Sequence, residues 1–135
     1  MVQHFEIQLT PKPRGYHIIT SEVIKEIPLP VSGIFHLFIK HTSAGLTINE
    51  NADPDVRLDF ESIFNQLVPE NLPFLTHTQE GSDDMPAHIK ASIVGNSISV
   101  PILEHELALG TWQGIYLCEF RNNGGSRKLI ASIYS

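Results

Sequence analysis

The segment from Gly33 to His41 constrains the fold most, because apolar residues alternate along it on both sides. In an extended chain, successive side chains point to opposite faces, so a strand here would be apolar on each face. The two faces carry Phe35, Leu37 and Ile39 on one side and Ile34 and Phe38 on the other. We therefore expect a central strand, buried in a single domain that covers residues 1–135.

Other alternating runs and three helical runs surround this segment. Asp53 is a good N-cap and Pro54 fits the first position of a helix that continues to Leu67, and Pro86 opens a second helix that ends at Val94. A shorter helix follows Thr20. The strands do not alternate regularly with these helices, which favours an α+β fold over a doubly wound sheet. The pattern predicts about seven strands and three helices, with strands near residues 5–9, 16–19, 34–41, 44–48, 98–102, 112–120 and 128–134.

Charge and cysteine content exclude several classes of partner and site. The chain has 9 basic and 15 acidic residues, a net charge of −6, and no run of Lys and Arg that would capture nucleic acid or an anionic membrane. With Cys118 as the only cysteine, neither an intrachain disulfide nor a cysteine-based zinc site is expected. The sequence shows no signal peptide and no apolar run of membrane-spanning length, so a cytoplasmic location is expected.

Three histidines occur in segments rich in polar residues, where a scaffold commonly presents functional groups. His41 ends the central strand, His77 begins a polar loop, and His88 lies about one turn into the second helix. Three imidazoles and an open position would make a catalytic zinc site. No local spacing such as His-x-x-x-His enforces this grouping, and in the alternative each histidine is hydrogen-bonded separately within its own element.

The acidic residues have both structural and functional interpretations. A helix N-terminus accounts for Asp53 and Asp55, whereas Glu50 lacks this explanation and is a candidate for magnesium or for catalysis. We expect one of Asp83 and Asp84 to cap the second long helix and the other to face the pocket.

Two further side chains are candidates for ligand contact. Arg121 is the best cation for binding an anion, although pairing with Glu119 would also explain it. Trp112 is more typical of a core or subunit interface than of a ligand platform, and Gln113 could orient a ligand.

Four motifs in this order resemble the YjbQ family, also called secondary thiamine-phosphate synthase. The similarity covers nearly the whole chain, and in the family pattern a glycine occupies the turn where this sequence has His105. The motifs are His41-Thr42-Ser43-Ala44, Asn49-Glu50-Asn51 with Asp53 to Val56, Glu80-Gly81 with Asp83 to His88, and Leu109-Gly110-Thr111-Trp112-Gln113-Gly114.

The resemblance implies a compact α+β fold containing a seven-stranded β-sandwich, a homotrimer, and a weak thiamine-phosphate synthase activity. That reaction joins hydroxymethylpyrimidine diphosphate to thiazole phosphate and releases pyrophosphate. The alternative is a non-enzymatic trimeric module that binds a metal or a small metabolite. The large aromatic residues Trp112, Tyr116 and Phe120 predict part of the trimer interface.

The residues and the resemblance together predict one pocket for a small phosphorylated or heteroaromatic metabolite. The expected site holds a divalent ion, zinc or magnesium, with Glu50 and Asp84 near its rim. We expect His41, His77 and His88 as metal ligands, Glu50 and Asp84 as catalytic groups, and Ser43, Asn49, Trp112, Gln113 and Arg121 as substrate-binding residues.

Overall fold

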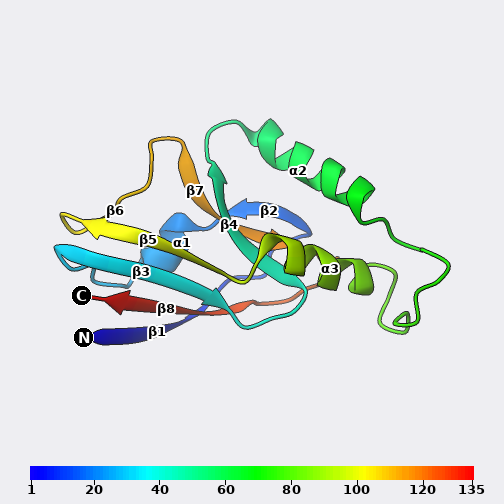
Figure 1. Ribbon diagram of the computed structural model, residues 1–135, viewed down its shortest axis with the longest axis horizontal. Helices are drawn as coiled ribbons and strands as arrows, with labels where there is room; N and C mark the ends of the chain where they lie inside the picture. The colour runs from blue at the N-terminus through cyan, green and yellow to red at the C-terminus, as the bar shows by residue number, and fades with distance from the viewer.

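The chain forms eight strands and three helices (Figure 1). The computed structural model describes residues 1–135, and the α+β prediction is confirmed. The eighth strand is the two-residue β6, which the sequence pattern did not indicate. The elements are β1 (Val2–Gln8), β2 (Gly15–Ile18), α1 (Thr20–Ile24), β3 (Ser32–Ile39), β4 (Ala44–Glu50), α2 (Pro54–Leu67), α3 (Asp84–Val94), β5 (Ser97–Leu103), β6 (Glu106–Leu107), β7 (Gln113–Glu119) and β8 (Lys128–Tyr134).

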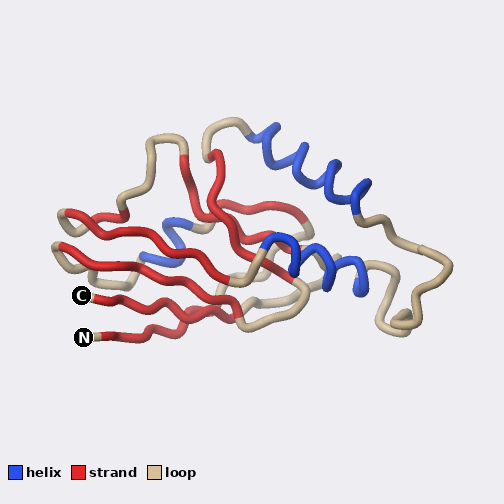
Figure 2. Tube along the Cα trace, viewed as in Figure 1, coloured by secondary structure: helices blue, strands red, loops and turns tan.

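The strands make two antiparallel sheets, one in the order β1-β8-β3-β5-β6 and the other in the order β2-β7-β4. The central position predicted for β3 is confirmed, because it pairs with β8 on one side and β5 on the other. The first and last strands also pair, so the two termini lie side by side (Figure 2). None of the three helices is long and apolar enough to cross a membrane.

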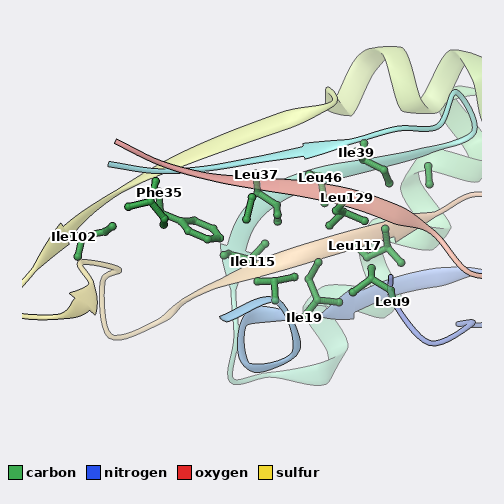
Figure 3. Close-up of a cluster of buried hydrophobic side chains, with 14 residues drawn as sticks. Leu9, Ile19, Phe35, Leu37, Ile39, Leu46, Ile102, Ile115, Leu117 and Leu129 are labelled. Carbon is green, nitrogen blue, oxygen red and sulfur yellow. The ribbon is translucent and has the colours of Figure 1, made fainter. Parts of the chain in front are cut away.

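The main core lies between the two sheets (Figure 3). Phe35 and Leu37 of β3 face Ile115 and Leu117 of β7, and all four side chains are buried completely. Each such side chain stabilises the fold by roughly 1.5–3 kcal/mol on burial. This core holds the two sheets in a fixed relation, and therefore fixes the loops at their ends.

A second core lies on the other face of the three-stranded sheet, under α2 and α3. Tyr116 and Phe120 point to this face and pack against Phe60 and Phe64 of α2. Tyr116 is 0% and Phe120 is 1% exposed, so the chain itself covers the aromatic face that we predicted for a trimer interface. That prediction was wrong for these two residues. Trp112 precedes β7 and is 65% exposed.

A buried polar contact ties α2 to α3. Lys90 of α3 is 1% exposed, and its ammonium group donates to Oδ1 of Asn65 in α2 at 2.7 Å. Arg14 donates to the same oxygen at 2.7 Å and also pairs with Glu70. Since α2 has no fully buried residue of its own, these contacts and its two phenylalanines hold it in place.

The hairpin between β5 and β6 turns through two residues with positive φ, Glu104 at 52° and His105 at 65°. Such a two-residue turn prefers Asn-Gly, because other residues pay a steric cost in the left-handed region. His105 is held there by a hydrogen bond between its Nδ1 and the Leu29 carbonyl at 2.9 Å.

Replacing Glu104 by Asn is therefore expected to stabilise the protein. Asn tolerates positive φ, so the free energy of unfolding should rise by about 0.5–1 kcal/mol in urea denaturation. Glu106→Asn, just beyond the turn and in a strand, is the control and should give no gain. Equal effects of the two changes would contradict this explanation.

Candidate metal centre

His77, Asp84 and His88 come together at the start of α3. His77 lies in the loop between α2 and α3, Asp84 is the first residue of α3, and His88 follows one turn later. Asp84 Oδ2 lies 2.6 Å from His77 Nε2 and 3.1 Å from His88 Nε2. The three ligand atoms lie within 4.8 Å of one another. The structure therefore brings together two of the three predicted histidines, with a carboxylate as the third member.

Helix geometry explains part of this grouping. Residues four apart lie on one face of a helix, so Asp84 and His88 point to the same side. The loop of residues 68–83 then returns His77 to that side. The spacing Asp84-x-x-x-His88 was a local signal for this pair. It was overlooked because only a His-x-x-x-His spacing was considered.

The other ring nitrogen of His88 determines what its Nε2 can do. Nδ1 lies 3.0 Å from the Thr42 carbonyl oxygen, which can only accept, so Nδ1 carries a proton. In neutral His88, Nε2 then presents a lone pair to Asp84 Oδ2. Two lone pairs facing each other at 3.1 Å require a proton or a metal ion between them. Metal-ligating histidines typically have this arrangement, with the second nitrogen donating to a carbonyl.

Arg121 fixes the carboxylate of Asp84 from the end of β7. Its Nη1 donates to Asp84 Oδ1 at 2.6 Å, its Nε to Asp83 Oδ2 at 2.8 Å, and its Nη2 to the Glu80 carbonyl at 3.0 Å. Burial alone would raise the pKa of Asp84, but hydrogen bonding from His77 and the charges of His88 and Arg121 lower it. Asp84 is thus held as a carboxylate, with Oδ2 left for the two histidines.

These partners differ from those predicted for Arg121, which were a bound anion or Glu119. The predicted alternative, pairing with Glu119, is limited to the backbone N–H of Arg121, since the Glu119 side chain pairs with Arg127. Each of its three guanidinium nitrogens donates to an acceptor in the protein, so Arg121 orients the acidic pair with three of its five N–H groups.

The donor set fits a zinc-type ion better than magnesium. Two imidazoles and one carboxylate are typical ligands of catalytic zinc and of non-haem iron, whereas magnesium prefers oxygen ligands. Tetrahedral bonds of about 2.1 Å place ligand atoms about 3.4 Å apart. The His88–Asp84 distance is close to this value, and His77, whose side chain is 45% exposed, has room to move outward.

His41 does not belong to this group, contrary to the predicted three-histidine site. Its Nε2 accepts a hydrogen bond from the Lys128 backbone N–H at 2.8 Å, and a lone pair used in this way is not available to a metal. Burial and the charge of Arg127 hold the pKa of His41 below its usual range. His41 is therefore a neutral ring with its proton on Nδ1.

The structure also separates the residues predicted to share one pocket. Glu50 and Asn49 end β4, whereas Ala44 at its start lies near Thr42 and the metal centre. Six residue steps along a strand correspond to about 20 Å. Glu50 is thus far from Asp84, and the prediction that both lie at one rim was wrong.

At the C-terminal end of β4, the side chains of Asn49, Glu50 and Gln113 hydrogen-bond to backbone N–H groups of nearby turns. The Glu50 carboxylate accepts from the N–H groups of Ala52 and Asp53, at 3.2 and 2.9 Å. Asn49 Oδ1 accepts from the Glu50 N–H, and Gln113 Oε1 accepts from the Gly110 N–H, both at 2.8 Å. These side chains shape the turns before α2 and β7, and only the exposed Trp112 beside them keeps its side chain free.

Ser43, a predicted substrate-binding residue, lies with His41 in the short connection between β3 and β4. It is 8% exposed, and its carbonyl oxygen faces Arg127 Nη2 at 3.4 Å.

The capping prediction for the acidic pair was also wrong. Asp83 precedes α3 but makes no side-chain cap, because its Oδ2 accepts from Arg121 and from the Asn122 N–H at 2.9 Å. Burial alone would raise the pKa of Asp83, but these hydrogen bonds and the charge of Arg121 lower it. A carboxyl group with a lowered pKa in the folded state stabilises the fold above its unfolded pKa, and this contribution is lost as the pH falls through the folded value.

We expect Asp83→Asn to lower the free energy of unfolding at pH 7 by about 1–3 kcal/mol, because charge-assisted hydrogen bonds are lost. The difference between the variant and the original protein should begin to shrink as the pH falls below about 4, the ordinary pKa of an aspartate, and should disappear as the pH passes through the lower pKa of folded Asp83. Urea denaturation of both proteins at several pH values measures this difference in the free energy of unfolding. A difference independent of pH would contradict the ion-pair explanation.

Comparisons with known proteins agree with this fold. A family model described as UPF0047 protein YjbQ-like matches residues 5–135. The UPF0047 protein YjbQ of Salmonella typhimurium is 49% identical over 130 residues, covering 94% of both chains. The chain belongs to the YjbQ-like UPF0047 family. This confirms the resemblance inferred from the four motifs.

Solved structures of similar proteins share the YjbQ fold. The conserved hypothetical protein TT1486 of Thermus thermophilus superimposes with a TM-score of 0.85 at 29% identity, covering 94% of this chain and 97% of that one. An uncharacterized conserved YjbQ/UPF0047-family protein of Clostridium acetobutylicum gives a TM-score of 0.82 at 35% identity, covering 96% and 98%. The two sheets and the helices described above therefore form the same fold as in these two structures.

Proposed function

We propose that this YjbQ-family protein is a metal-dependent enzyme that binds a zinc-type divalent ion at His77, Asp84 and His88 and acts on a phosphorylated small molecule. The observation that carries the proposal is the His88 ring, which donates through Nδ1 to the Thr42 carbonyl and directs Nε2 at Asp84. Three protein ligands leave one position open for substrate or water, as in catalytic zinc sites.

The reaction that we propose for this site is thiamine-phosphate synthesis, which the family resemblance implies. The C–O bond between the pyrimidine methylene carbon and the diphosphate breaks, and its electron pair leaves with pyrophosphate. The lone pair of the thiazole nitrogen then forms the new C–N bond. A bound divalent ion supplies the positive charge that stabilises the leaving diphosphate.

The residues around the ion site have defined tasks in this proposal. Arg121 keeps Asp84 ionised and oriented, and the Thr42 carbonyl keeps the proton of His88 on Nδ1. His77 is the most exposed of the three ligands and lies on the wall of a small hollow of about 140 Å³. No covalent nucleophile is needed, because binding and alignment of the two rings supply much of the rate acceleration.

The second candidate is a non-enzymatic homotrimeric module that binds a metal or a metabolite. Exposed apolar side chains on the outer face of the five-stranded sheet support an assembled state, because no helix packs there. Val2, Ile34, Phe38 and Tyr134 are 48%, 41%, 38% and 48% exposed. We include the homotrimer in the proposal, and light scattering that shows a monomer at micromolar concentration would refute it.

Two measurements on the purified protein test the proposal. Zinc, iron(II), manganese and magnesium are titrated by calorimetry, and zinc or iron(II) should bind one ion per chain. The metal-loaded protein is then given hydroxymethylpyrimidine diphosphate and thiazole phosphate, and formation of thiamine phosphate and pyrophosphate is followed. Metal binding without turnover would favour the binding module, whereas absence of binding by all four ions would refute the metal-dependent enzyme and leave only a module that binds a metabolite.

A further inference from the structure

His41 has an unused hydrogen-bond donor beside the metal centre. Because its Nε2 accepts from the Lys128 N–H, the neutral ring carries its proton on Nδ1. No group of the protein accepts from this Nδ1. His41 is partly exposed and its Nδ1 is not a buried atom, so this N–H is accessible to a ligand.

His41 borders an open hollow of about 420 Å³. His41 and Thr42 form one wall, and Ala91, Ser92, Gly95 and Asn96 form the other. Asp84, His88 and Ser92 follow each other at intervals of four residues, so they share one face of α3. The hollow and the metal centre are therefore neighbours along this face, with Thr42 contacting both.

The charge around His41 favours an anion, although the whole chain has a net charge of −6. The charges of Lys40 and Lys128 reach the His41 ring, and neither lysine forms an ion pair, but both line an adjoining hollow beside Glu6 rather than this one. Arg127 is neutralised by Glu119. The C-terminal end of α3 opposes an anion with about half a negative charge, and the charges of the two lysines act against this from the adjoining hollow.

We infer that the hollow between His41 and α3 is an anion subsite, in which His41 Nδ1–H donates to the phosphate group of the ligand. The phosphorylated nature of the ligand rests on the proposed function, but the subsite does not depend on the metal ion. His41 is then a substrate-binding residue, placed one residue from the carbonyl that orients His88.

Nuclear magnetic resonance of the metal-free protein with ¹⁵N-labelled histidine tests the inference. The spectrum should show His41 with its proton on Nδ1, and added inorganic phosphate should shift this Nδ1 signal while sodium chloride at equal ionic strength should not. His17, whose Nε2 lies 2.7 Å from the Pro13 carbonyl, is the internal control. Its signals should stay unchanged.

Variants at His41 provide a second test of the anion subsite. His41→Phe should weaken phosphate binding by about 10-fold or more, whereas His41→Gln, whose amide both accepts and donates, should stay within about threefold of the original protein. Zinc affinity, titrated separately, should stay within about threefold in both variants, because His41 is not a ligand.

Different results would refute the anion subsite at His41 and the metal centre at His77, Asp84 and His88. A His41 proton on Nε2, or a phosphate titration that leaves the Nδ1 signal unchanged, overturns the anion subsite even if zinc binds. Since both readouts use the original protein, a His41→Phe variant that does not fold leaves the test intact. A phosphate response at His41 in a protein that binds no divalent ion would retain the subsite and refute the metal centre.

Discussion

Replacing Glu119 by Gln is expected to lower the free energy of unfolding by about 3–5 kcal/mol, the typical cost of removing one partner from a buried ion pair. Glu119 is 0% and Arg127 is 4% exposed. Arg127 Nε donates to Glu119 Oε1 at 2.7 Å, and Arg127 Nη2 donates to Oε2. In the variant, the Gln amide would present N–H groups to the guanidinium, so a buried positive charge would lose its partner.

The same change at a half-buried pair at the surface is the control. Lys12 and Glu22 form an ion pair at 2.7 Å, but their side chains are 18% and 31% exposed. Glu22→Gln should cost at most about 1 kcal/mol, because water screens such pairs. Urea denaturation of both variants gives the loss in the free energy of unfolding. Similar losses in the two variants would show that burial does not make the Glu119–Arg127 pair contribute more than the Lys12–Glu22 pair.

The second large effect concerns metal affinity. His88→Ala removes one of three ligands, and we expect zinc to bind at least about 100-fold more weakly, since even residues that only orient metal ligands cost 10–100-fold. Asp84→Asn should give a comparable loss by removing the carboxylate charge between the two rings. Calorimetric titration with zinc at pH 7.5 measures both.

His17→Ala is the matched control for these variants, because it removes an imidazole from β2 that is not part of the cluster. Its zinc affinity should remain unchanged. Affinity in the original protein should also fall as the pH drops through the range near 6.5 in which imidazoles take up protons, since protonated imidazole does not bind metal. An equal loss in the His17 and His88 variants would indicate scattered surface binding.

Local patterns in the sequence were sufficient for most of the fold. The two apolar faces of β3 predicted its central position, and Asp53 with Pro54 marked the start of α2, where Asp53 Oδ1 accepts from the Asp55 N–H at 2.9 Å. Both are local effects of strand alternation and helix capping. The aromatic face of β7 was also predicted, but the helices that cover it come from distant segments, so its role as a second core was not.

The candidate site was predicted only in part, because it depends on which ends of the strands meet. His77 and His88 were identified by type and segment, but the sequence did not show that β4 carries Glu50 to its opposite end, about 20 Å along the strand from Ala44. Nor did it show that the Lys128 N–H occupies Nε2 of His41, or that Arg121 reaches back to Asp84. These contacts join residues 87 and 37 positions apart, which no local pattern records.

The central claim is that His77, Asp84 and His88 bind one divalent ion, and a crystal of the protein grown with zinc tests it most directly. Anomalous diffraction at the zinc absorption edge should show one strong peak per chain, about 2.0–2.2 Å from His77 Nε2, His88 Nε2 and Asp84 Oδ2. The His88 Nδ1 hydrogen bond to the Thr42 carbonyl should persist. A fully occupied zinc ion at other residues, or no peak at this cluster while the hydrogen bonds of Asp84 to both rings remain, would contradict the account.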